Sequence, residues 1–249
     1  MTITSHRNER LKAVRKLAQR RWRDRTGRFV AEGEDLLAAA DAHGWAPLER
    51  YAAAGSGLPG TPVAADALAA VSQLGSGTRA LAVYAQRWAD APVGPLCVAL
   101  HGVADPGNVG TVVRSAHAFG AASVALGPGC ADPFGPKAVR ASMGAIFAVP
   151  LARVRAVDEL PGRTIALDAR ATTPLRGPLE GPATLLVGAE RDGLPADALA
   201  AADAVVAIPI RSESLNAAMA ATVALYEATR GRVGRDDAPA ASTHRMGAA

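Results

Sequence analysis

Residues 105–120, DPGNVGTVVRSAHAFG, place a Gly-rich turn directly before a helix-like run whose first exposed charge is a single arginine. Gly107 and Gly110 permit close backbone approach, and Asn108 is a residue type that caps helices. Arg114 follows six positions after Asn108, on the expected helix. Such a loop can cradle a phosphate, bend around a cofactor or simply turn the chain. In isolation, a capped strand-to-helix turn is the default interpretation.

Two later stretches also run from an apolar strand into a polar loop. In LVGAERDGL, the strand ends at Gly188 and the carboxylate of Glu190 follows. In IPIRSESLN, a polar loop leads to Ser214, which we expect to cap the next helix. None of the three loops contains the G-K-[ST] of a nucleoside triphosphate site or the G-x-G-x-x-G of a dinucleotide site. The sequence therefore argues against both ligand classes.

The elements that position these loops alternate between strands and helices from residue 96 onward. The expected strands are VALHGV, ASVALG, AIFAVPL, TIALDA, ATLLVGAE and VVAIPI, and the main expected helices span 108–119, 137–143 and 214–230. Several strands are apolar throughout, which predicts a parallel sheet covered on both faces. In such a sheet, ligands bind beyond the carboxyl ends of the strands, which is where the three loops lie.

Residues 29–88 alternate short apolar runs with Ala/Leu-rich helical stretches, as in a small α/β domain, and DAPVGP at 90–95 has the composition of a linker. We therefore expect one domain at 1–92 and a second at 93–231. The remaining residues, 232–249, show no periodicity and are expected to form a disordered tail.

The overall composition indicates an α/β protein, because aromatic residues make up only 4% while small aliphatic residues are abundant. Cys97 and Cys130 have no second Cys/His pair near them, which argues against a zinc site and a disulfide framework. The chain starts with charged residues, and no stretch approaches the roughly 20 apolar residues of a membrane span. We expect a cytoplasmic protein with no metal and no membrane contact.

Positive charge is concentrated at the start of the chain. Residues 1–28 contain ten Lys/Arg and two acidic residues, whereas the net charge of the whole chain is only +4. Leu11, Val14, Ala18 and Trp22 recur at helical spacing, which predicts one amphipathic helix with a basic exposed flank. Such a flank either faces solvent or attracts a polyanion, and the charge pattern alone leaves both open.

Taken together and in this order, the three loops closely resemble the motifs of the SpoU (TrmH-like) RNA 2′-O-ribose methyltransferases of the SPOUT superfamily. The resemblance covers about residues 95–230 and includes PKAVRASMGAIFAVP, with Pro136, Lys137, Arg140, Ser142 and Gly144. The stretch from Ile3 to Leu37 is similar to the L30e-like substrate-binding extension of members that act on rRNA. This second similarity favours RNA contact for the basic flank.

The resemblance implies a parallel-sheet domain with a deep trefoil knot, preceded by a small L30e-like α/β domain, in a homodimer that methylates structured RNA, most often rRNA. S-adenosylmethionine would be the methyl donor. The residues expected around it are Leu186, Gly188, Ile208, Ile210, Leu215 and Asn216. The expected catalytic residues are Asn108, Arg114, Glu190, Ser214 and Asn216. The expected RNA contacts are Arg7, Arg10, Lys12, Arg15, Lys16, Arg20, Arg21 and Arg140.

Several alternatives accompany this interpretation. A catalytically silent RNA-binding assembly module would use the same surface, and a tRNA-directed enzyme would share the same motifs. In the family, removal of the hydroxyl proton is assigned to the arginine that matches Arg114. A guanidinium holds its proton up to a pH above about 12, so electrostatic stabilisation is an equally good role.

His101 and His117 lie beside apolar runs and are expected to be structural. AAMAA after Asn216 departs from the usual VSVAA, which makes cofactor contacts there less certain.

Overall fold

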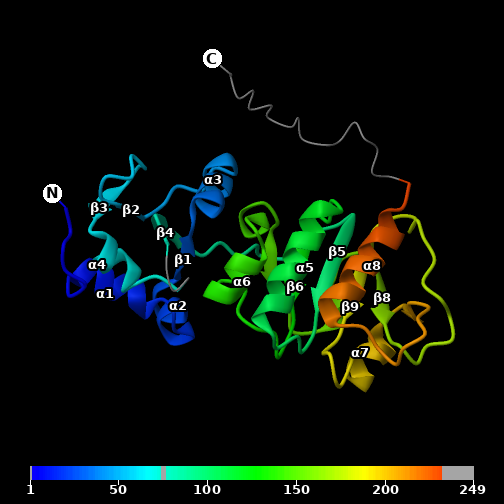
Figure 1. Ribbon diagram of the computed structural model, residues 1–249. Coiled ribbons are helices and arrows are strands. Elements are labelled where there is room, and N and C mark those ends of the chain that lie inside the picture. Colours follow the sequence, from blue (N-terminus) through cyan, green and yellow to red (C-terminus); the bar gives the residue numbers. More distant parts are fainter. Residues whose placement is uncertain (1, 74–76, 232–249) are drawn as a thin grey trace, which may run out of the picture.

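The computed structural model describes residues 2–73 and 77–231, and it contains a four-stranded and a six-stranded sheet that lie side by side (Figure 1). The tail expected at 232–249 lies outside the described residues. Within the described ranges, no helix combines the length and the apolar character that crossing a bilayer requires.

The first sheet has the strand order β1-β4-β2-β3. Strand β4 pairs antiparallel with β1 and β2, while β2 and β3 are parallel. The strands are β1 (Arg28–Glu32), β2 (Glu49–Ala53), β3 (Thr61–Val63) and β4 (Ala80–Ala85). The helices are α1 (Glu9–Lys16), α2 (Arg20–Thr26), α3 (Glu34–Ala42) and α4 (Ala65–Ala69). The alternation of strands and helices expected for residues 29–88 is confirmed.

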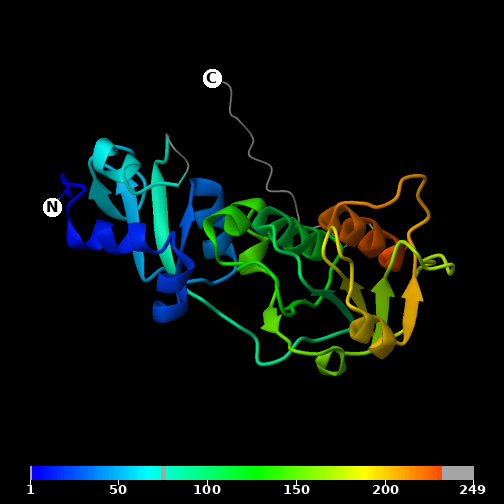
Figure 2. The ribbon, with the colours of Figure 1, turned by 90° about the horizontal axis from the view of Figure 1, so that it is seen from below.

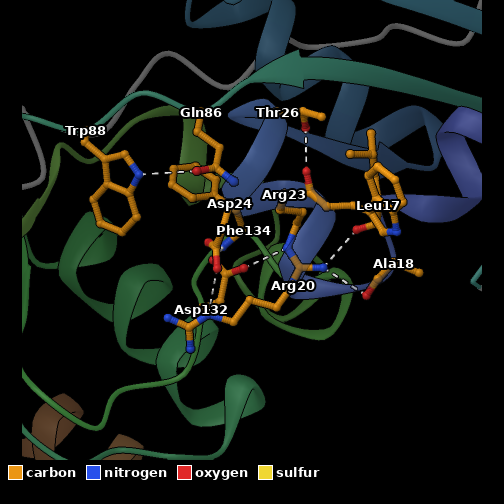
Figure 3. Close-up of polar contacts among 11 residues, drawn as sticks. Leu17, Ala18, Arg20, Arg23, Asp24, Thr26, Gln86, Trp88, Asp132 and Phe134 are labelled. Atoms are coloured by element: carbon orange, nitrogen blue, oxygen red, sulfur yellow. Dashed lines mark hydrogen bonds and ion pairs between the residues drawn. The ribbon is translucent and has the colours of Figure 1, made fainter.

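The basic N-terminal segment forms two helices rather than the single helix that the sequence predicts. The side chain of Arg23 turns inward at the break, where its Nη1 donates to the carbonyls of Leu17 (2.8 Å) and Ala18 (2.9 Å), as Figure 3 shows. A helix end leaves its last carbonyls without partners, and this guanidinium satisfies two of them. Arg23 is therefore buried, although it belongs to the basic N-terminal segment.

The second sheet has the order β10-β8-β9-β5-β6-β7, and all of its pairs are parallel. Its strands are β5 (Leu96–Leu100), β6 (Ser123–Leu126), β7 (Leu151–Arg153), β8 (Arg163–Leu167), β9 (Ala183–Val187) and β10 (Ala204–Val206). Its helices are α5 (Pro106–Ala118), α6 (Pro136–Ala141), α7 (Ala196–Ala201) and α8 (Ala217–Thr229), with 3₁₀ turns η1 (Ala145–Phe147) and η2 (Val157–Glu159).

Both faces of this sheet are covered, as the continuous apolar runs predict. Figure 2 shows α5 and α8 on one face and α7 on the other. Leu185 and Val187 of β9 belong to the core on the α5/α8 side, whereas Leu186 points to the α7 side. This alternation follows from the two-residue period of a strand, and it decides which side chains reach each face.

Several expected element boundaries are wrong. The run AIFAVPL begins as the 3₁₀ turn η1, because Gly144 adopts a left-handed backbone (φ 91°) before it, and only its last residue belongs to β7. The strand expected over VVAIPI ends at Val206. The helix expected from 214 begins at Ala217, and the helix expected from 108 begins at Pro106, the favoured first position for proline.

The apolar core is continuous between the two sheets. Phe29 and Tyr84 of the first sheet meet Phe134 and Phe147, with ring centroids 4.8 Å apart for Phe29–Phe134 and 5.2 Å apart for Tyr84–Phe147. The Trp45 indole nitrogen also donates a 2.9 Å hydrogen bond to the Phe147 carbonyl. Truncation before residue 93 would therefore expose Phe134 and Phe147, although the composition of 90–95 indicates a simple linker.

Candidate active site

One residue from each of the three loops joins a continuous chain of hydrogen bonds. The Asn108 amide in the first turn of α5 donates to Oε1 of Glu190, which lies in the loop after β9. The Asn216 amide, at the start of α8, donates to Oδ1 of Asn108 across 3.1 Å. The fold thus unites candidate motifs that lie far apart in the sequence.

The cap of α5 is Asp105 and not Asn108. Asp105 Oδ1 accepts the backbone N–H of Asn108 (3.0 Å), and its Oδ2 accepts from Lys137 Nζ (2.6 Å). The hydrogen bond from Lys137 is the main cause that lowers the pKa of Asp105 below its usual range. Because Asp105 caps the helix, the side chain of Asn108 is available to reach Glu190.

The cap of α8 is likewise not the serine that the sequence indicates. Asn216 Oδ1 accepts the backbone N–H groups of Ala218 (3.0 Å) and Met219 (3.3 Å). Ser214 lies two residues earlier, in the loop. Asn216 therefore fixes the start of α8 with its oxygen and holds Asn108 with its nitrogen.

A cavity of about 380 Å³ opens beside this hydrogen-bonded chain, at the carboxyl ends of β8, β9 and β10. Its size falls in the range of about 300–1,000 Å³ typical of small-molecule sites. The sequence-predicted residues that line it are Gly188, Glu190, Ile208, Ile210, Ser214 and Leu215. Leu186 does not line it, because its side chain points to the α7 face and borders a separate cavity of about 390 Å³.

Glycine at 188 serves the packing of the protein's own loop. A Cβ there would lie 2.3 Å from the carbonyl carbon of Gly193, because residues 189 and 193 exchange two backbone hydrogen bonds of 3.0 and 3.1 Å. Gly110 is similar, since a Cβ would lie 2.2 Å from the Ala138 carbonyl oxygen where α5 packs on α6. Gly110 thus belongs to a helix contact and does not shape the turn.

The sequence analysis missed Asp168 and Arg170, which line the same cavity from the loop after β8. The Arg170 guanidinium donates two hydrogen bonds to the Asp168 carboxylate, from Nε–H (3.1 Å) and from Nη2–H (2.9 Å). These bonds are the main cause that lowers the pKa of Asp168. The sequence did point to them, since the expected strand TIALDA contains Asp168 near its carboxyl end and Arg170 follows directly, where ligands of a parallel sheet bind.

Comparison with known proteins identifies the chain. The profile of the SpoU rRNA Methylase family matches residues 95–226, more than half of the chain, and that of the MRM3-like substrate binding domain matches residues 8–80. The protein belongs to the SpoU rRNA methylase family. The profile spans all three loops of the candidate site and the cavity beside them.

Relatives of this SpoU-family protein align over nearly its whole length. An uncharacterized tRNA/rRNA methyltransferase of Synechocystis is 32% identical, over 92% of this chain and 93% of its own. The 23S rRNA (guanosine(2553)-2′-O)-methyltransferase RlmP of Bacillus subtilis is 29% identical, over 90% and 97%. The AdoMet-bound structure of an rRNA methyltransferase from Sinorhizobium meliloti superposes with a TM-score of 0.83 at 30% identity, over 94% and 99%.

In this SpoU-family chain, Arg114 lies exposed on α5 and takes no part in the contacts among Asn108, Glu190 and Asn216. Within residues 2–73 and 77–231, no hydrogen bond or ion pair holds its guanidinium. Helix α5 packs on α8 through a 2.7 Å hydrogen bond between the hydroxyls of Ser115 and Thr222. The neighbouring surface of α8 exposes three large apolar side chains, Met219, Val223 and Tyr226.

The two candidate histidines stand apart from the hydrogen-bonded chain. His101 borders the cavity that Leu186 lines, and His117 makes an edge contact with His43, at 5.9 Å between ring centroids. In the part of the chain that the structure describes, no group of three or more His, Cys, Asp or Glu is arranged to hold a metal ion.

Seven of the eight residues expected to contact RNA lie on or beside α1 and α2, and Arg140 lies on α6. Most of them are exposed, and Lys12 is half-buried. Lys16, Arg21 and Arg25 surround the Trp22 ring at 4.8, 5.9 and 5.4 Å from its centroid. The opposite side of α1 buries Leu11 and Val14, and of the cations on the two helices Arg23 is buried while most of the others face solvent.

Proposed function

We propose that this SpoU-family protein transfers a methyl group from S-adenosylmethionine to a ribose 2′-hydroxyl of rRNA. The observation that carries the proposal is the chain of hydrogen bonds linking Asn108, Glu190 and Asn216 at the edge of the 380 Å³ cavity. The Sinorhizobium relative that binds AdoMet and the Bacillus relative that methylates a 23S rRNA ribose support the choice of cofactor and substrate.

The cavity suits this cofactor in both shape and charge. Its apolar part comes from Ile208, Ile210 and Leu215, which fit a flat adenine ring. Its charged lining has more carboxylates than guanidinium groups: Asp168, Glu190, Asp192 and Glu213 against Arg170 and Arg191. When bound, the cofactor supplies an electrophilic methyl group on a cationic sulfonium. A lining with more carboxylates than guanidinium groups favours a cationic ligand by electrostatic attraction.

The protein's remaining task is to orient and activate a weak nucleophile. Asn108 holds Glu190 in place and is itself held by Asn216, so the three side chains form a rigid constellation. We assign Arg114 to clamping a substrate phosphate and to stabilising the charge that develops on the hydroxyl oxygen while the hydroxyl proton passes to solvent. Its lack of a partner within the described residues leaves it available for this role.

We also infer a homodimer, formed through the surface shared by α5 and α8. Met219 and Tyr226 are 61% and 55% exposed there, an unusual exposure for large apolar side chains, and Arg114 lies on the adjacent helix. The family resemblance adds a trefoil knot in the C-terminal chain. Sedimentation equilibrium tests the dimer, because Tyr226→Glu should yield monomers.

The exposed cations of α1 and α2 and Arg140 of α6 are the proposed RNA contacts, with 1–92 as the substrate-binding domain and 93–231 as the catalytic one. Because the proposed substrate is rRNA, we propose a cytoplasmic location. Calorimetric titration with S-adenosylmethionine separates the enzyme from a silent RNA-binding module, which would not bind it. Mapping 2′-O-methyl groups in rRNA and tRNA with and without the gene tests the substrate class.

A further inference from the structure

An open groove of about 840 Å³ separates α2 from the end of β7. Its walls come from α2, from the segment after β4 and from the residues that follow β6 and β7. We call it the basic groove, and its defining side chains are Arg20, Trp88, Arg153 and Arg155. The cofactor cavity shares none of the residues that line it.

The basic groove carries more positive charge than its own carboxylates neutralise. Within the described residues, the guanidinium groups of Arg153 and Arg155 have no hydrogen-bonded or ion-paired acceptor, and Arg20 makes only a long, exposed contact of 3.5 Å with Asp24. Asp132 is already paired with Arg23. The other carboxylate, Glu159, accepts the backbone N–H of Arg155 at 3.0 Å. Exposed cations of this kind attract phosphates.

A flat stacking surface lies beside these cations. The guanidinium of Arg153 sits over the Trp88 ring, 4.2 Å from its centroid, and the edge of Trp88 packs on Phe134 at 5.2 Å. The Trp88 indole nitrogen also donates to Gln86 at 3.4 Å, as Figure 3 shows. These contacts orient the indole, and Arg153 remains exposed at the groove. Unpaired RNA bases stack on arginine planes and on aromatic rings.

A buried ion pair fixes the width of the basic groove. Arg23 Nε donates to Asp132 Oδ2 at 2.7 Å, with side chains only 5% and 10% exposed, so it links α2 to the loop after β6 (Figure 3). Asp132 Oδ1 in turn accepts the backbone N–H of Phe134 at 2.9 Å. The groove is therefore preformed, which reduces the entropy that binding must overcome.

The basic groove also lies on the same edge of the sheet as the proposed active site. Its floor follows β6 and β7, which are the first and second strands beyond β5 in the sheet, and β5 leads to the loop of Asn108. Hydrogen bonds join the loops after β5 and β6, with Gly102 N–H donating to the Pro128 carbonyl at 2.9 Å. Two strand spacings are about 10 Å, so one RNA strand can reach from the groove to the Asn108 loop.

We propose that the basic groove binds an unpaired stretch of the RNA substrate next to the methylated nucleotide. One base stacks on the paired planes of Arg153 and Trp88, while Arg155 and Arg20 contact the flanking phosphates. The groove thereby selects a single-stranded acceptor region, whereas the other exposed cations of α1 and α2 hold the surrounding structured RNA. This assignment deepens the proposed function and rests on it for the identity of the substrate.

The test uses the full-length protein and fluorescence anisotropy with two probes, a single-stranded decauridylate and a 16-base-pair RNA duplex. The double variant Arg153→Glu/Arg155→Glu should weaken decauridylate binding at least tenfold and reduce the salt slope by about 0.7 for each phosphate that the protein no longer neutralises. Arg163→Glu is the matched control. It removes an exposed arginine at the amino end of β8, on the opposite edge of the sheet, and should change neither value.

Arg153→Lys separates stacking from charge, because lysine keeps the positive charge but lacks the planar guanidinium on which a base can stack. It should weaken decauridylate binding while leaving the salt slope unchanged. Unchanged decauridylate affinity in the double variant would contradict the proposal that the basic groove binds unpaired RNA. An equal loss of affinity for the duplex would contradict it as well. If the wild-type protein binds RNA through the groove but does not bind S-adenosylmethionine, the proposed function is refuted. The RNA-binding role of the basic groove would still hold.

Discussion

The side-chain amide of Asn216 donates a 3.1 Å hydrogen bond to Oδ1 of Asn108, a residue 108 positions earlier in the chain. The same side chain caps α8 through its oxygen, which accepts two backbone N–H groups. One residue therefore stabilises a helix and also closes the proposed catalytic constellation. These two roles can be separated by substitution, because different atoms perform them.

Asn216→Ser should keep the helix cap and lose the amide donor. We expect the thermal midpoint to stay within about 1 °C of wild type, because serine caps helices as well as asparagine. Methyl transfer should fall about tenfold, or about 1.4 kcal/mol of activation free energy, because Asn108 and Glu190 are no longer held in place for the transition state. Differential scanning calorimetry and single-turnover transfer from labelled cofactor measure the two effects.

Asn216→Ala is the control, since it removes both functions. It should show the same loss of transfer together with a destabilisation of about 1 kcal/mol, which lowers the midpoint by roughly 2–4 °C in a chain of this size. Wild-type transfer by the serine variant would mean that the bond to Asn108 has no catalytic consequence.

Arg114→Ala should lower methyl transfer by at least about 100-fold, the scale of losing one preorganised charge at a developing oxyanion. Cofactor affinity and thermal stability should stay near wild type, because the side chain is exposed and no partner holds it within the described residues. Arg163→Ala, also exposed, should be neutral in all three measurements. Transfer at the wild-type rate in Arg114→Ala would remove this residue from the mechanism.

The α/β class and most of the strands were predictable because continuous apolar runs identify strands buried on both faces, as in β5 and β9. The use of each glycine was not predictable. Gly188 and Gly110 are required by contacts with Gly193 and Ala138, which depend on how the loop folds back and how two helices cross. Sequence spacing carries no information about such distances.

The helix caps show a second limit. Asn108 and Ser214 are both good capping residues, yet Asp105 and Asn216 hold those positions. Local preference could not choose among neighbouring polar residues, because the choice depends on which side chain a distant partner engages. The same applies to Arg23, whose burial depends on Asp132, 109 positions later.

The stability contributed by Asp105 should vanish in acid. Its pKa is lowered chiefly by the hydrogen bond from Lys137, so the ionised carboxylate favours folding above its unfolded pKa of about 3.9 and loses this advantage as the pH falls through the folded value. Asp105→Asn keeps a capping oxygen and removes the charge. Its difference from wild type in urea midpoint should be constant from pH 7 to about 5 and shrink below about 4. A difference that stays constant through the acid range would contradict this account.

The buried pair of Arg23 and Asp132 should be among the most sensitive sites for folding. Asp132→Ala leaves a buried guanidinium without its carboxylate and should cost about 3–5 kcal/mol in urea unfolding. Arg20→Ala removes a cation from the same helix but breaks only an exposed contact, and should cost less than about 1 kcal/mol. Equal effects would show that the pair does not anchor α2 to the second sheet.

The most direct test of the proposed activity is to replace one hydroxyl in the substrate. After the methylated nucleotide has been mapped in rRNA, an RNA fragment carrying a single 2′-deoxy at that position is offered to the wild-type protein with labelled S-adenosylmethionine. The fragment should bind with nearly unchanged affinity and accept no methyl group, while the matched ribose fragment is fully methylated. Methylation of the deoxy fragment at the same nucleotide would show that the acceptor is a base, and would contradict the assignment of this site to ribose 2′-O-methylation.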